Sequence, residues 1–389
     1  MSATGTRGSV LIAVTHLLGS GHLVRAAHLA RALAEGGFAV TLASGGMPLR
    51  AMTGEPFDFV QLPPVKVEGV DFRNLLDEEG RPIDVSRREA RQALLRELAV
   101  SLRPDVVVTE HFPFGRRQLA DEFLGLIAAA KAARPKVLVL SSVRDVLVTP
   151  RPDRIAEAHR RIETMFDGVL VHGDRAFLPL DASWPVSAEL ASRLHYTGYL
   201  AASPSFRGAR DGREGEILVS GGGSGAALPL FRLCVEAARL SDPVWRWRLL
   251  VGRGLGEGLF AELRQSASPN VIVERARPDF PELLAACALS ISQAGYNTVL
   301  DLVAAGRPAI VVPFDEGAET EQAVRADAME RAGLARCLRL SDADAASPGP
   351  FAAAVAATLA AGPPHPLAID RDGAGMVAGI ARRLLAARA

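Results

Sequence analysis

The sequence predicts an α/β protein with two domains, each built on a parallel sheet. The first observation is that short runs rich in Val, Ile and Leu alternate along the chain with Ala/Leu/Arg-rich stretches of helical spacing. Continuously apolar strands separated by helices are typical of parallel sheets covered on both faces. The second observation is a pattern that occurs in both halves, namely a strand followed by a glycine-rich segment. Strand 10–15 leads into Gly19-Ser20-Gly21, and strand 217–220 leads into a glycine-rich loop at 221–225.

The length and the composition predict the domain organisation. A chain of 389 residues suffices for two domains, and 49% hydrophobic residues supply their cores. Residues 203–215 are rich in Ser, Pro, Gly, Arg and Asp, which predicts a linker between an N-terminal domain at 1–202 and a C-terminal domain at 216–370. We expect 371–389 to form a terminal helix that packs back on the N-terminal domain.

The individual elements follow in chain order from the same apolar runs. In the N-terminal half, strands are expected at 10–14, 39–43, 105–109, 137–141 and 168–172, with a helix at 24–35. In the C-terminal half, strands are expected at 216–220, 248–251, 271–274, 289–292 and 309–312, with a helix at 323–332. The charged, weakly periodic segment 67–91 is predicted to be a long loop.

Several classes of protein are disfavoured by composition. The 44 basic and 44 acidic residues cancel, which argues against a general nucleic-acid binder. Cys234, Cys287 and Cys337 are far apart, so neither a disulfide framework nor a zinc site is expected. No apolar run reaches the roughly 20 residues needed to cross a bilayer, and 10–18 lacks a cleavage pattern, so we expect a cytoplasmic protein.

The turn after the first strand is the first candidate site. Small residues at Gly19-Ser20-Gly21 would let a ligand approach the backbone, and His22 would stand at the helix start as a candidate general base. Arg25 could contact a phosphate. In the alternative reading the glycines only make the turn, His22 caps it and Arg25 is solvated. The dinucleotide-binding fingerprint is incomplete, because the third glycine and the later acid are missing, which disfavours a nicotinamide dehydrogenase.

The glycine-rich loop of the second half predicts a phosphate site. Backbone N–H groups of Gly222 and Gly223 and the hydroxyl of Ser224 could hold a diphosphate, although a plain flexible turn is the alternative. The lysine of a P-loop is absent, so an ATPase of that class is not indicated.

A second turn, at Ala294-Gly295, opens a helix whose N-terminal N–H groups suit an anion. Asp301 follows within two helical turns and could accept hydrogen bonds from sugar hydroxyls. A phosphate at the helix start with an acid nearby suggests a nucleotide or nucleotide-sugar site. Glu321 and Gln322 follow the last strand and suit sugar-hydroxyl recognition, although an acid here could simply stabilise a helix N-terminus.

Polar residues also follow strands of the first half. Glu110 and His111 come directly after one strand and Asp145 closely follows another, so each could line the same crevice. In the alternative interpretation, these residues have only a structural role and pack within their loops.

The segment 112–117 combines phenylalanines with paired arginines. Phe112, Phe114, Arg116 and Arg117 could touch a lipid-linked or anionic acceptor, or make a peripheral contact with a membrane. More commonly such residues pack a loop.

Together, segments 19–25, 220–225 and 293–322 resemble the GT-B glycosyltransferases, specifically the MurG-like family 28 group. The resemblance covers the chain in order and is most specific in the C-terminal half. It implies two Rossmann-like domains whose parallel sheets face each other across a cleft. It further implies that the C-terminal domain holds a nucleotide-sugar donor, usually UDP-linked, that the N-terminal domain holds the acceptor, and that an inverting reaction needs no bound metal or other cofactor.

The resemblance also assigns roles to residues. Donor phosphates would be held by Gly222, Gly223, Ser224, Gly295, Tyr296, Asn297 and Thr298. Asp301 would bind the ribose and stands where the family more often has glutamate. Arg277 lies where the backbone of the family's proteins contacts the edge of the uracil ring. Glu321 and Gln322 match the pair of residues that contacts the donor sugar. The acceptor side would comprise Gly19, Ser20, Gly21, Arg25 and His111 around His22.

Two readings compete with transfer of the sugar to an acceptor hydroxyl deprotonated by His22, Glu110 or Asp145. The spacing Gly19-x-Gly21-His22-x-x-Arg25 also resembles the nucleotide-sugar hydrolases of the pseudaminic-acid pathway, in which the histidine activates water. The other reading is a non-catalytic nucleotide-sugar-binding subunit. Release of free sugar from the donor alone would favour the hydrolase, and tight binding without turnover would favour the binder.

Overall fold

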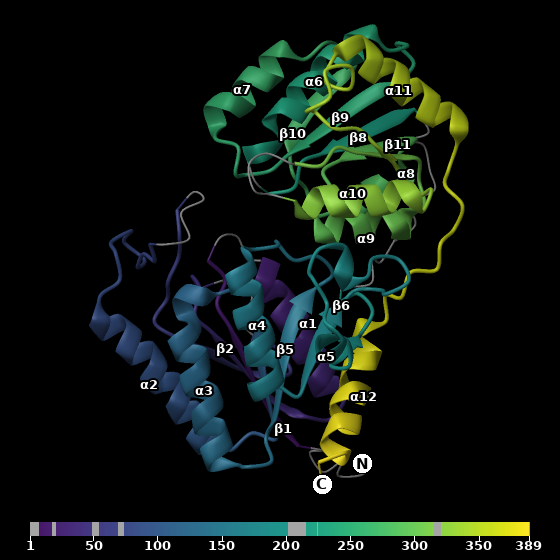
Figure 1. The fold of residues 1–389 in the computed structure, drawn as a ribbon. Helices are drawn as coiled ribbons and strands as arrows, with labels where there is room; N and C mark the ends of the chain where they lie inside the picture. Colours follow the sequence, from purple (N-terminus) through teal and green to yellow (C-terminus); the bar gives the residue numbers. More distant parts are fainter. Residues whose placement is uncertain are drawn as a thin grey trace. The chain divides into compact units, whose positions relative to one another are not determined.

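The computed structural model describes residues 8–17, 21–48, 54–68, 74–200, 215–223, 225–314 and 320–388. The chain divides into two compact units (Figure 1). Unit 1 comprises residues 1–202 together with 370–389, and unit 2 comprises residues 203–369. Among the described residues, each unit contains one sheet whose named strands all pair in parallel, so the α/β class expected from the apolar runs is confirmed.

The sheet of unit 1 has seven strands in the order β3-β2-β1-β4-β5-β6-β7. The strands are β1 Ser9–Val14, β2 Ala39–Ser44, β3 Asp58–Gln61, β4 Val106–Glu110, β5 Leu138–Arg144, β6 Gly168–His172 and β7 Leu194–Tyr196. The strand order reverses at β1, which pairs with β2 on one side and with β4 on the other. Ligands of open parallel sheets bind beyond the carboxyl ends of the strands at such a switch point.

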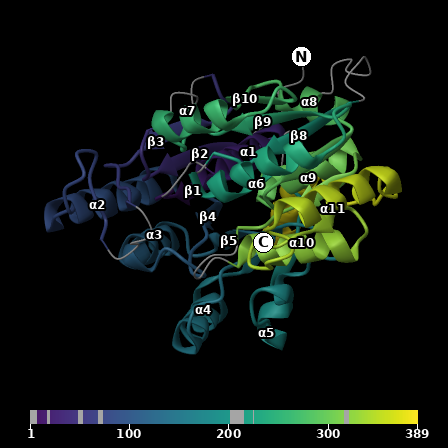
Figure 2. The same cartoon turned by 90° about the horizontal axis from the view of Figure 1, so that it is seen from above.

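Helices cover both faces of this sheet. They are α1 Gly21–Glu35, α2 Val85–Leu102, α3 Ala120–Ala133, α4 Pro152–Met165, the single turn α5 Ala188–Ala191, and α12 Gly373–Ala386. One core lies between the sheet and α1 with α12, where Val377 and Ile380 pack beside Leu23 and Leu29. The other core lies under α2, α3 and α4, with α2 packed against α3 (Figure 2).

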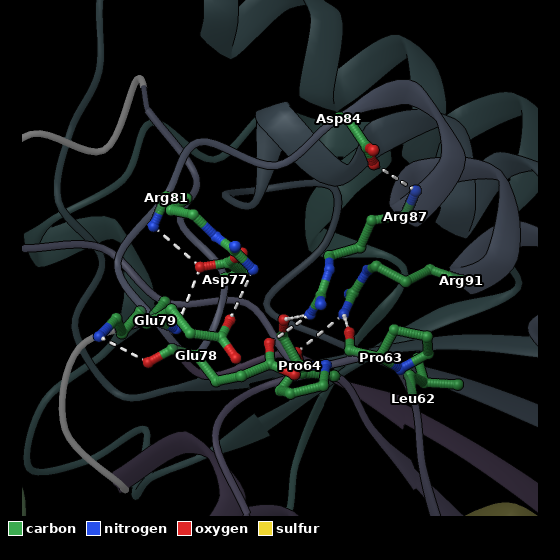
Figure 3. A network of polar contacts seen from close by, with 12 residues as sticks. Leu62, Pro63, Pro64, Asp77, Glu78, Glu79, Arg81, Asp84, Arg87 and Arg91 are labelled. Atoms are coloured by element: carbon green, nitrogen blue, oxygen red, sulfur yellow. Dashed lines mark hydrogen bonds and ion pairs between the residues drawn. The ribbon is translucent and has the colours of Figure 1, made fainter.

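The expectation of a long loop over 67–91 is wrong for the end of that segment, because α2 begins at Val85. Asp84 caps the helix by accepting a hydrogen bond from the backbone N–H of Arg87 at 2.8 Å. The side chains of Arg87 and Arg91 donate to the carbonyl oxygens of Pro64 and Pro63 (Figure 3). These tertiary bonds stabilise a helix whose apolar pattern is weak, and local periodicity therefore does not reveal it.

Arg91 is fully buried and forms a two-pronged ion pair with Glu122 of α3, at 2.7 and 2.8 Å. A planar guanidinium and a carboxylate match each other in this geometry. Since removing one partner would leave an unpaired buried charge, this pair ties α2 to α3.

Unit 2 has a six-stranded parallel sheet in the order β10-β9-β8-β11-β12-β13. The strands are β8 Glu216–Ser220, β9 Arg246–Val251, β10 Val271–Arg275, β11 Leu289–Ser292, β12 Ala309–Val311 and β13 Arg336–Cys337. The helices are α6 Leu228–Leu240, α7 Glu257–Ser266, α8 Phe280–Ala286, α9 Tyr296–Ala305, α10 Glu321–Arg331 and α11 Pro348–Ala361. The core packs α6 and α11 on one face of the sheet, and the switch point lies at β8, between β9 and β11.

Within the described ranges, no helix has both the length and the apolar character needed to cross a membrane.

Candidate active site

A cluster of buried polar side chains lies at the carboxyl ends of the strands of unit 1, beside the switch point. Glu110 is the last residue of β4 and is 1% exposed. His22 stands in the first turn of α1, and its Nδ1 lies 2.8 Å from Oε1 of Glu110. Arg25, one turn further along α1, donates from Nη2 to the same oxygen and lies 3.1 Å from His22 Nδ1. Sequence analysis named these three residues, and the structure brings them together.

The electrostatics of the cluster determine its protonation. Burial pushes the pKa of Glu110 upward, but Arg25, His111 and His172 outweigh burial, so that its pKa lies below the usual value. Burial, reinforced by Arg116, Arg25 and Arg144, holds the pKa of His22 well below 6.5. At neutral pH the pair is therefore a carboxylate and a neutral imidazole.

The tautomer of His22 follows from this charge state. An ionised carboxylate can only accept, so the Nδ1 atom at 2.8 Å carries the proton. The Nε2 atom then holds a lone pair. A neutral imidazole with a free Nε2 lone pair and an oriented Nδ1–H is the arrangement that a general base needs.

His111 and Arg116 lie beside this pair on a strained turn. The imidazole rings of His22 and His111 are 5.2 Å apart, and both His111 (φ 65°) and Arg116 (φ 59°) have left-handed backbone conformations. A Cβ atom at Gly115 would lie 2.3 Å from Cδ2 of His111, so a larger residue there would have to displace the imidazole ring of His111. Such strain in non-glycine residues often marks a functional turn.

Three arginines, Arg116, Arg25 and Arg144, lie close enough to His22 to lower its pKa. Burial, with Arg144 and Arg25 nearby, lowers the pKa of Arg116 to about 10. Its guanidinium has no hydrogen-bond partner among the residues that the structure describes. The neighbourhood therefore favours a ligand that carries a negative charge.

Asp145 does not join the cluster at His22. Its carboxylate is 1% exposed and accepts hydrogen bonds from the backbone N–H of Val146 at 2.9 Å and from the hydroxyl of Tyr199 at 3.2 Å. These contacts hold the Asp145 carboxylate at the strand end.

The expectation that Phe112 and Phe114 contact a lipid or a membrane is wrong. Phe112 is 0% exposed and stacks on Phe123, and Phe114 packs edge-on against Trp184. Both rings fill the core under α3 and α4, which is the bland alternative for this segment.

A hydrogen-bonded chain that sequence analysis did not assemble continues from Glu110 across three more strand ends. Ser142 of β5 lies 3.1 Å from Oε2 of Glu110 and 2.9 Å from Nε2 of His172 at the end of β6. Nδ1 of His172 lies 2.9 Å from Oγ1 of Thr197, just beyond β7. The only signal in the sequence was that Ser142 and His172 stand at the ends of apolar runs, and Thr197 had no such signal.

The glycine-rich loop of unit 2 presents its backbone to open space. Gly222 has φ 66°, which favours glycine, and no atom lies within 4 Å of a Cβ atom built at Gly222 or Gly223. The loop is braced from behind, because the backbone N–H of Gly254 donates to the carbonyl oxygen of Gly223 at 3.1 Å. A Cβ atom at Gly252 would lie 2.2 Å from the carbonyl oxygen of Gly222, so Gly252 is a further residue that the loop requires.

The second turn of unit 2 opens α9 as expected. Gly295 precedes the helix, and Tyr296, Asn297 and Thr298 form its first turn. Asp301 is half-buried, and its burial raises the pKa of the carboxyl to about 6.

The residues that follow β12 make contacts within unit 2. Oε1 of Gln322 accepts a hydrogen bond from the backbone N–H of Phe314 at 3.1 Å. Glu321 is buried and lies 3.6 Å from the guanidinium of Arg325, which in turn lies 5.9 Å from the ring centre of Tyr296. Arg325, which is 2% exposed, was missed by sequence analysis because it sits in the interior of a helix without any motif.

Arg277 is engaged by neighbouring acids. Its guanidinium forms a fork with Asp279 at 2.6 and 2.8 Å and reaches Glu274 at 3.4 Å. The hydrogen bonds to Asp279 hold its pKa above the usual value. The Arg277 side chain thus stabilises the loop after β10.

Gly19, Ser20 and Ser224, which were also predicted to line the sites, lie outside the described residues. Across the described ranges, no cluster of three or more His, Cys, Asp or Glu side chains is placed to hold a metal ion.

Comparison with known proteins adds the family. Residues 217–348 match the glycosyltransferase family 28 C-terminal domain, which covers most of unit 2. The chain has the GT-B fold and is similar to MurG, and unit 2 contains the family 28 C-terminal domain. The MurG structure from Acinetobacter baumannii superposes with a TM-score of 0.58 at 17% identity, covering 96% of this chain and 95% of that one. The calicheamicin glycosyltransferase CalG4 superposes with a TM-score of 0.59 at 18% identity over 98% and 94% of the two chains.

Two curated relatives carry the name UDP-N-acetylglucosamine–N-acetylmuramyl-(pentapeptide) pyrophosphoryl-undecaprenol N-acetylglucosamine transferase. The protein from Solibacter usitatus is 35% identical over 130 residues, which are 32% of this chain and 35% of the relative. The protein from Paramagnetospirillum magneticum is 31% identical over 217 residues, which are 54% of each chain. The MurG-like chain thus spans about a third to a half of the length of these relatives.

Proposed function

We propose that this MurG-like protein is an inverting glycosyltransferase that moves a sugar from a nucleotide-sugar, with UDP as the nucleotide, to an acceptor hydroxyl without a metal ion. The observation that carries the proposal is the His22–Glu110 pair at the switch point of unit 1, joined in one chain to a family 28 C-terminal domain. The relatives' names include a UDP-linked sugar, which supports the choice of donor.

In the proposed reaction His22 is the general base. Its Nε2 atom accepts the proton of the acceptor hydroxyl while the hydroxyl oxygen bonds to the anomeric carbon and the bond from that carbon to the diphosphate breaks. Glu110, an ionised acceptor on Nδ1–H, stabilises the imidazolium that forms. A direct displacement of this kind inverts the anomeric centre.

Unit 2 supplies the groups for the leaving nucleoside diphosphate. Backbone N–H groups of Gly222 and Gly223 and of the first turn of α9 can donate hydrogen bonds to the phosphate oxygens, on which negative charge develops. Asp301 would bind ribose hydroxyls, and Glu321 with Gln322 would orient the donor sugar. The backbone N–H groups would provide the electrostatic stabilisation that a metal ion provides in other transferases.

The acceptor would carry a negative charge close to the hydroxyl that reacts. Arg116, Arg25 and Arg144 all act on the imidazole of His22, and Glu110 is the carboxylate that contacts it. The relatives' names specify a pyrophosphoryl-undecaprenol compound, which is a lipid-linked anion. We propose an acceptor of this chemical class, with peripheral membrane contact as its consequence.

The proposal is tested in two steps. Thermal-shift measurements with a panel of nucleoside diphosphates and their sugars should single out one nucleotide, since a ligand that binds only the native state raises apparent stability. Turnover with that donor should then require both an acceptor and His22. The absence of stabilisation by any nucleotide would overturn the donor assignment.

A nucleotide-sugar hydrolase is the second candidate. It is favoured by one observation, namely that His22 and Arg25, at the spacing which resembles the hydrolase motif, converge on the same carboxylate oxygen. Release of free sugar from the donor at a full rate without an acceptor would establish this activity in place of transfer. Tight donor binding with neither transfer nor hydrolysis would instead indicate a binding subunit.

A further inference from the structure

We propose that Ser142 and His172 are positioning residues for the His22 base: through a buried chain of hydrogen bonds they hold Glu110 as an acceptor and so select the tautomer of His22. The geometric part stands on the structure of unit 1 alone. The kinetic consequence rests on the proposed function, in which His22 takes a proton from the acceptor.

The chain links residues that are remote in sequence. Parallel pairing places Glu110 of β4 beside Ser142 of β5, and β6 brings His172 to the same edge of the sheet. The successive distances are 2.8 Å from His22 to Glu110, 3.1 Å from Glu110 to Ser142 and 2.9 Å from Ser142 to His172. Glu110 and Ser142 are each 1% exposed and His172 is 0% exposed, so bulk water does not compete for these bonds.

The direction of each hydrogen bond follows from the charge on Glu110. An ionised carboxylate accepts from Ser142, which commits the single hydroxyl proton of that serine. The serine oxygen must then accept from Nε2–H of His172. The neutral His172 has one N–H, because burial, with Arg25 nearby, lowers its pKa to about 3 against the opposing effect of Glu110. Its Nδ1 is therefore left as an acceptor facing Thr197.

The hydrogen bonds could run in the opposite direction, starting from Thr197 at the far end of the hydrogen-bonded chain. The Thr197 oxygen lies 2.7 Å from the carbonyl oxygen of Gly198, a contact that would favour the opposite polarity, with His172 protonated on Nδ1. That polarity would turn the proton of Ser142 away from Glu110. Hydrogen bonds to a charged acceptor are about twice as strong as neutral ones, so the carboxylate end determines the polarity.

Arg25 makes this polarity relevant to His22. Its Nη2 lies 3.1 Å from Nδ1 of His22, close enough to donate to that atom if Nδ1 lost its proton. His22 would then carry its proton on Nε2 and could not act as a base. With Ser142 donating to Oε2, Glu110 remains ionised and fixed, and it claims the Nδ1 proton of His22. Ser142 and His172 therefore act on the base through Glu110.

Imidazole NMR of the full-length protein, labelled with ¹⁵N in its histidines, tests the proposal without any substrate. At mildly alkaline pH the wild-type protein should show opposite tautomers, Nδ1–H for His22 and Nε2–H for His172, with each signal assigned by its His→Gln substitution. Finding His172 protonated on Nδ1, or His22 protonated on Nε2, would overturn the proposal.

Variants separate positioning from packing. Ser142→Ala should give His22 a detectable population of the Nε2–H tautomer, and His172→Phe should do the same. His172→Gln, which keeps a donor, should restore much of the wild-type pattern. The matched control is Ser141→Ala, because this neighbouring serine is equally buried and bonds to the carbonyl oxygen of Phe112, outside the chain. An identical His22 spectrum in Ser142→Ala and Ser141→Ala would refute the role of Ser142.

Kinetics give a second readout that does not depend on the NMR. If the proposed transfer is observed, Ser142→Ala should lower kcat about tenfold, the effect of losing one charge-assisted hydrogen bond, with the donor KM unchanged. A rise in donor KM with kcat unchanged would contradict positioning. If no transfer is observed at all, the proposed function fails. The tautomer measurement still tests whether Ser142 and His172 position His22 through the chain of hydrogen bonds.

Discussion

The two sheets of this MurG-like protein end in very different ways, although both are parallel and both have a switch point. In unit 1 the strand ends are filled by buried charged side chains that contact one another, with Glu110 at the centre. In unit 2 they expose backbone, since Gly222 and Gly223 border open space. A base needs an oriented side chain in a low-dielectric setting, whereas a diphosphate needs N–H groups and room.

Removing the base should produce the largest effect. His22→Ala should lower kcat by roughly 10²- to 10⁴-fold, the range expected for a general base, while donor affinity stays at the wild-type value. Rapid-quench kinetics and a donor titration would measure the two quantities. Unchanged turnover would remove His22 from the reaction and leave unit 1 without an assigned base.

The corresponding change in unit 2 acts on the backbone. Gly252→Ala places a Cβ atom 2.2 Å from the carbonyl oxygen of Gly222, and backbone cannot yield as a side chain would. We expect a loss of about 1–3 kcal/mol in stability and at least about tenfold weaker donor binding, judged from overpacking at other sites. Gly256→Ala is the control, because no atom lies within 4 Å of its added carbon. Equal donor affinity in both variants would show that the loop does not bind the donor.

Acid should destabilise unit 1 through its buried histidines. His172 has a folded pKa of about 3 and an unfolded pKa of about 6.5, so between these values the unfolded chain binds a proton that the folded chain does not. Stability therefore falls as the pH drops, by up to about 1.4 kcal/mol per pH unit for this residue. Denaturant unfolding at several pH values should show a shallower slope for His172→Gln, and an unaltered slope would mean that His172 is protonated in the folded state.

Asp301 of unit 2 should show the opposite, smaller dependence. Its folded pKa of about 6 lies above the usual aspartate value, so the stability that it contributes is present in acid and lost as the pH rises through about 6. Asp301→Asn should consequently stabilise the ligand-free protein near neutral pH by about 1 kcal/mol, a value reduced for partial exposure. The same variant should weaken donor binding. Lower stability at neutral pH would show that the carboxylate has a favourable partner.

Some strands and helices were predictable from the sequence and others were not. The central strands were predictable because their residues are buried on both faces and form continuous apolar runs. The short edge strands β3, β7 and β13 were missed, since they are only partly buried and carry no such run. Helix α2 was missed because Arg87 and Arg91, which hold its first turns, look like solvated charges until Pro63, Pro64 and Glu122 lie beside them.

The candidate site divides in the same way. His22, Arg25 and Glu110 were recognisable because each follows a strand directly or opens the next helix, which are the places where ligands meet parallel sheets. Ser142 and His172 were not assembled, and Asp145 was grouped with His22 although it contacts Val146 and Tyr199. Position after a strand predicts the edge of the sheet on which a side chain lies, but not the neighbour that it contacts.

The amino-acid sequence by itself determined the parallel α/β class, the glycine turns at the strand ends and the family of the C-terminal half, because these depend on local patterns of apolar residues and glycines. Only the tertiary structure decided which polar residues share a hydrogen bond. Glu110, Ser142 and His172 are about 30 residues apart from one to the next, and parallel pairing of β4, β5 and β6 alone brings them within 3.1 Å of each other in turn. Burial then sets their protonation, since desolvation depends on what packs around a group and not on its neighbours in sequence.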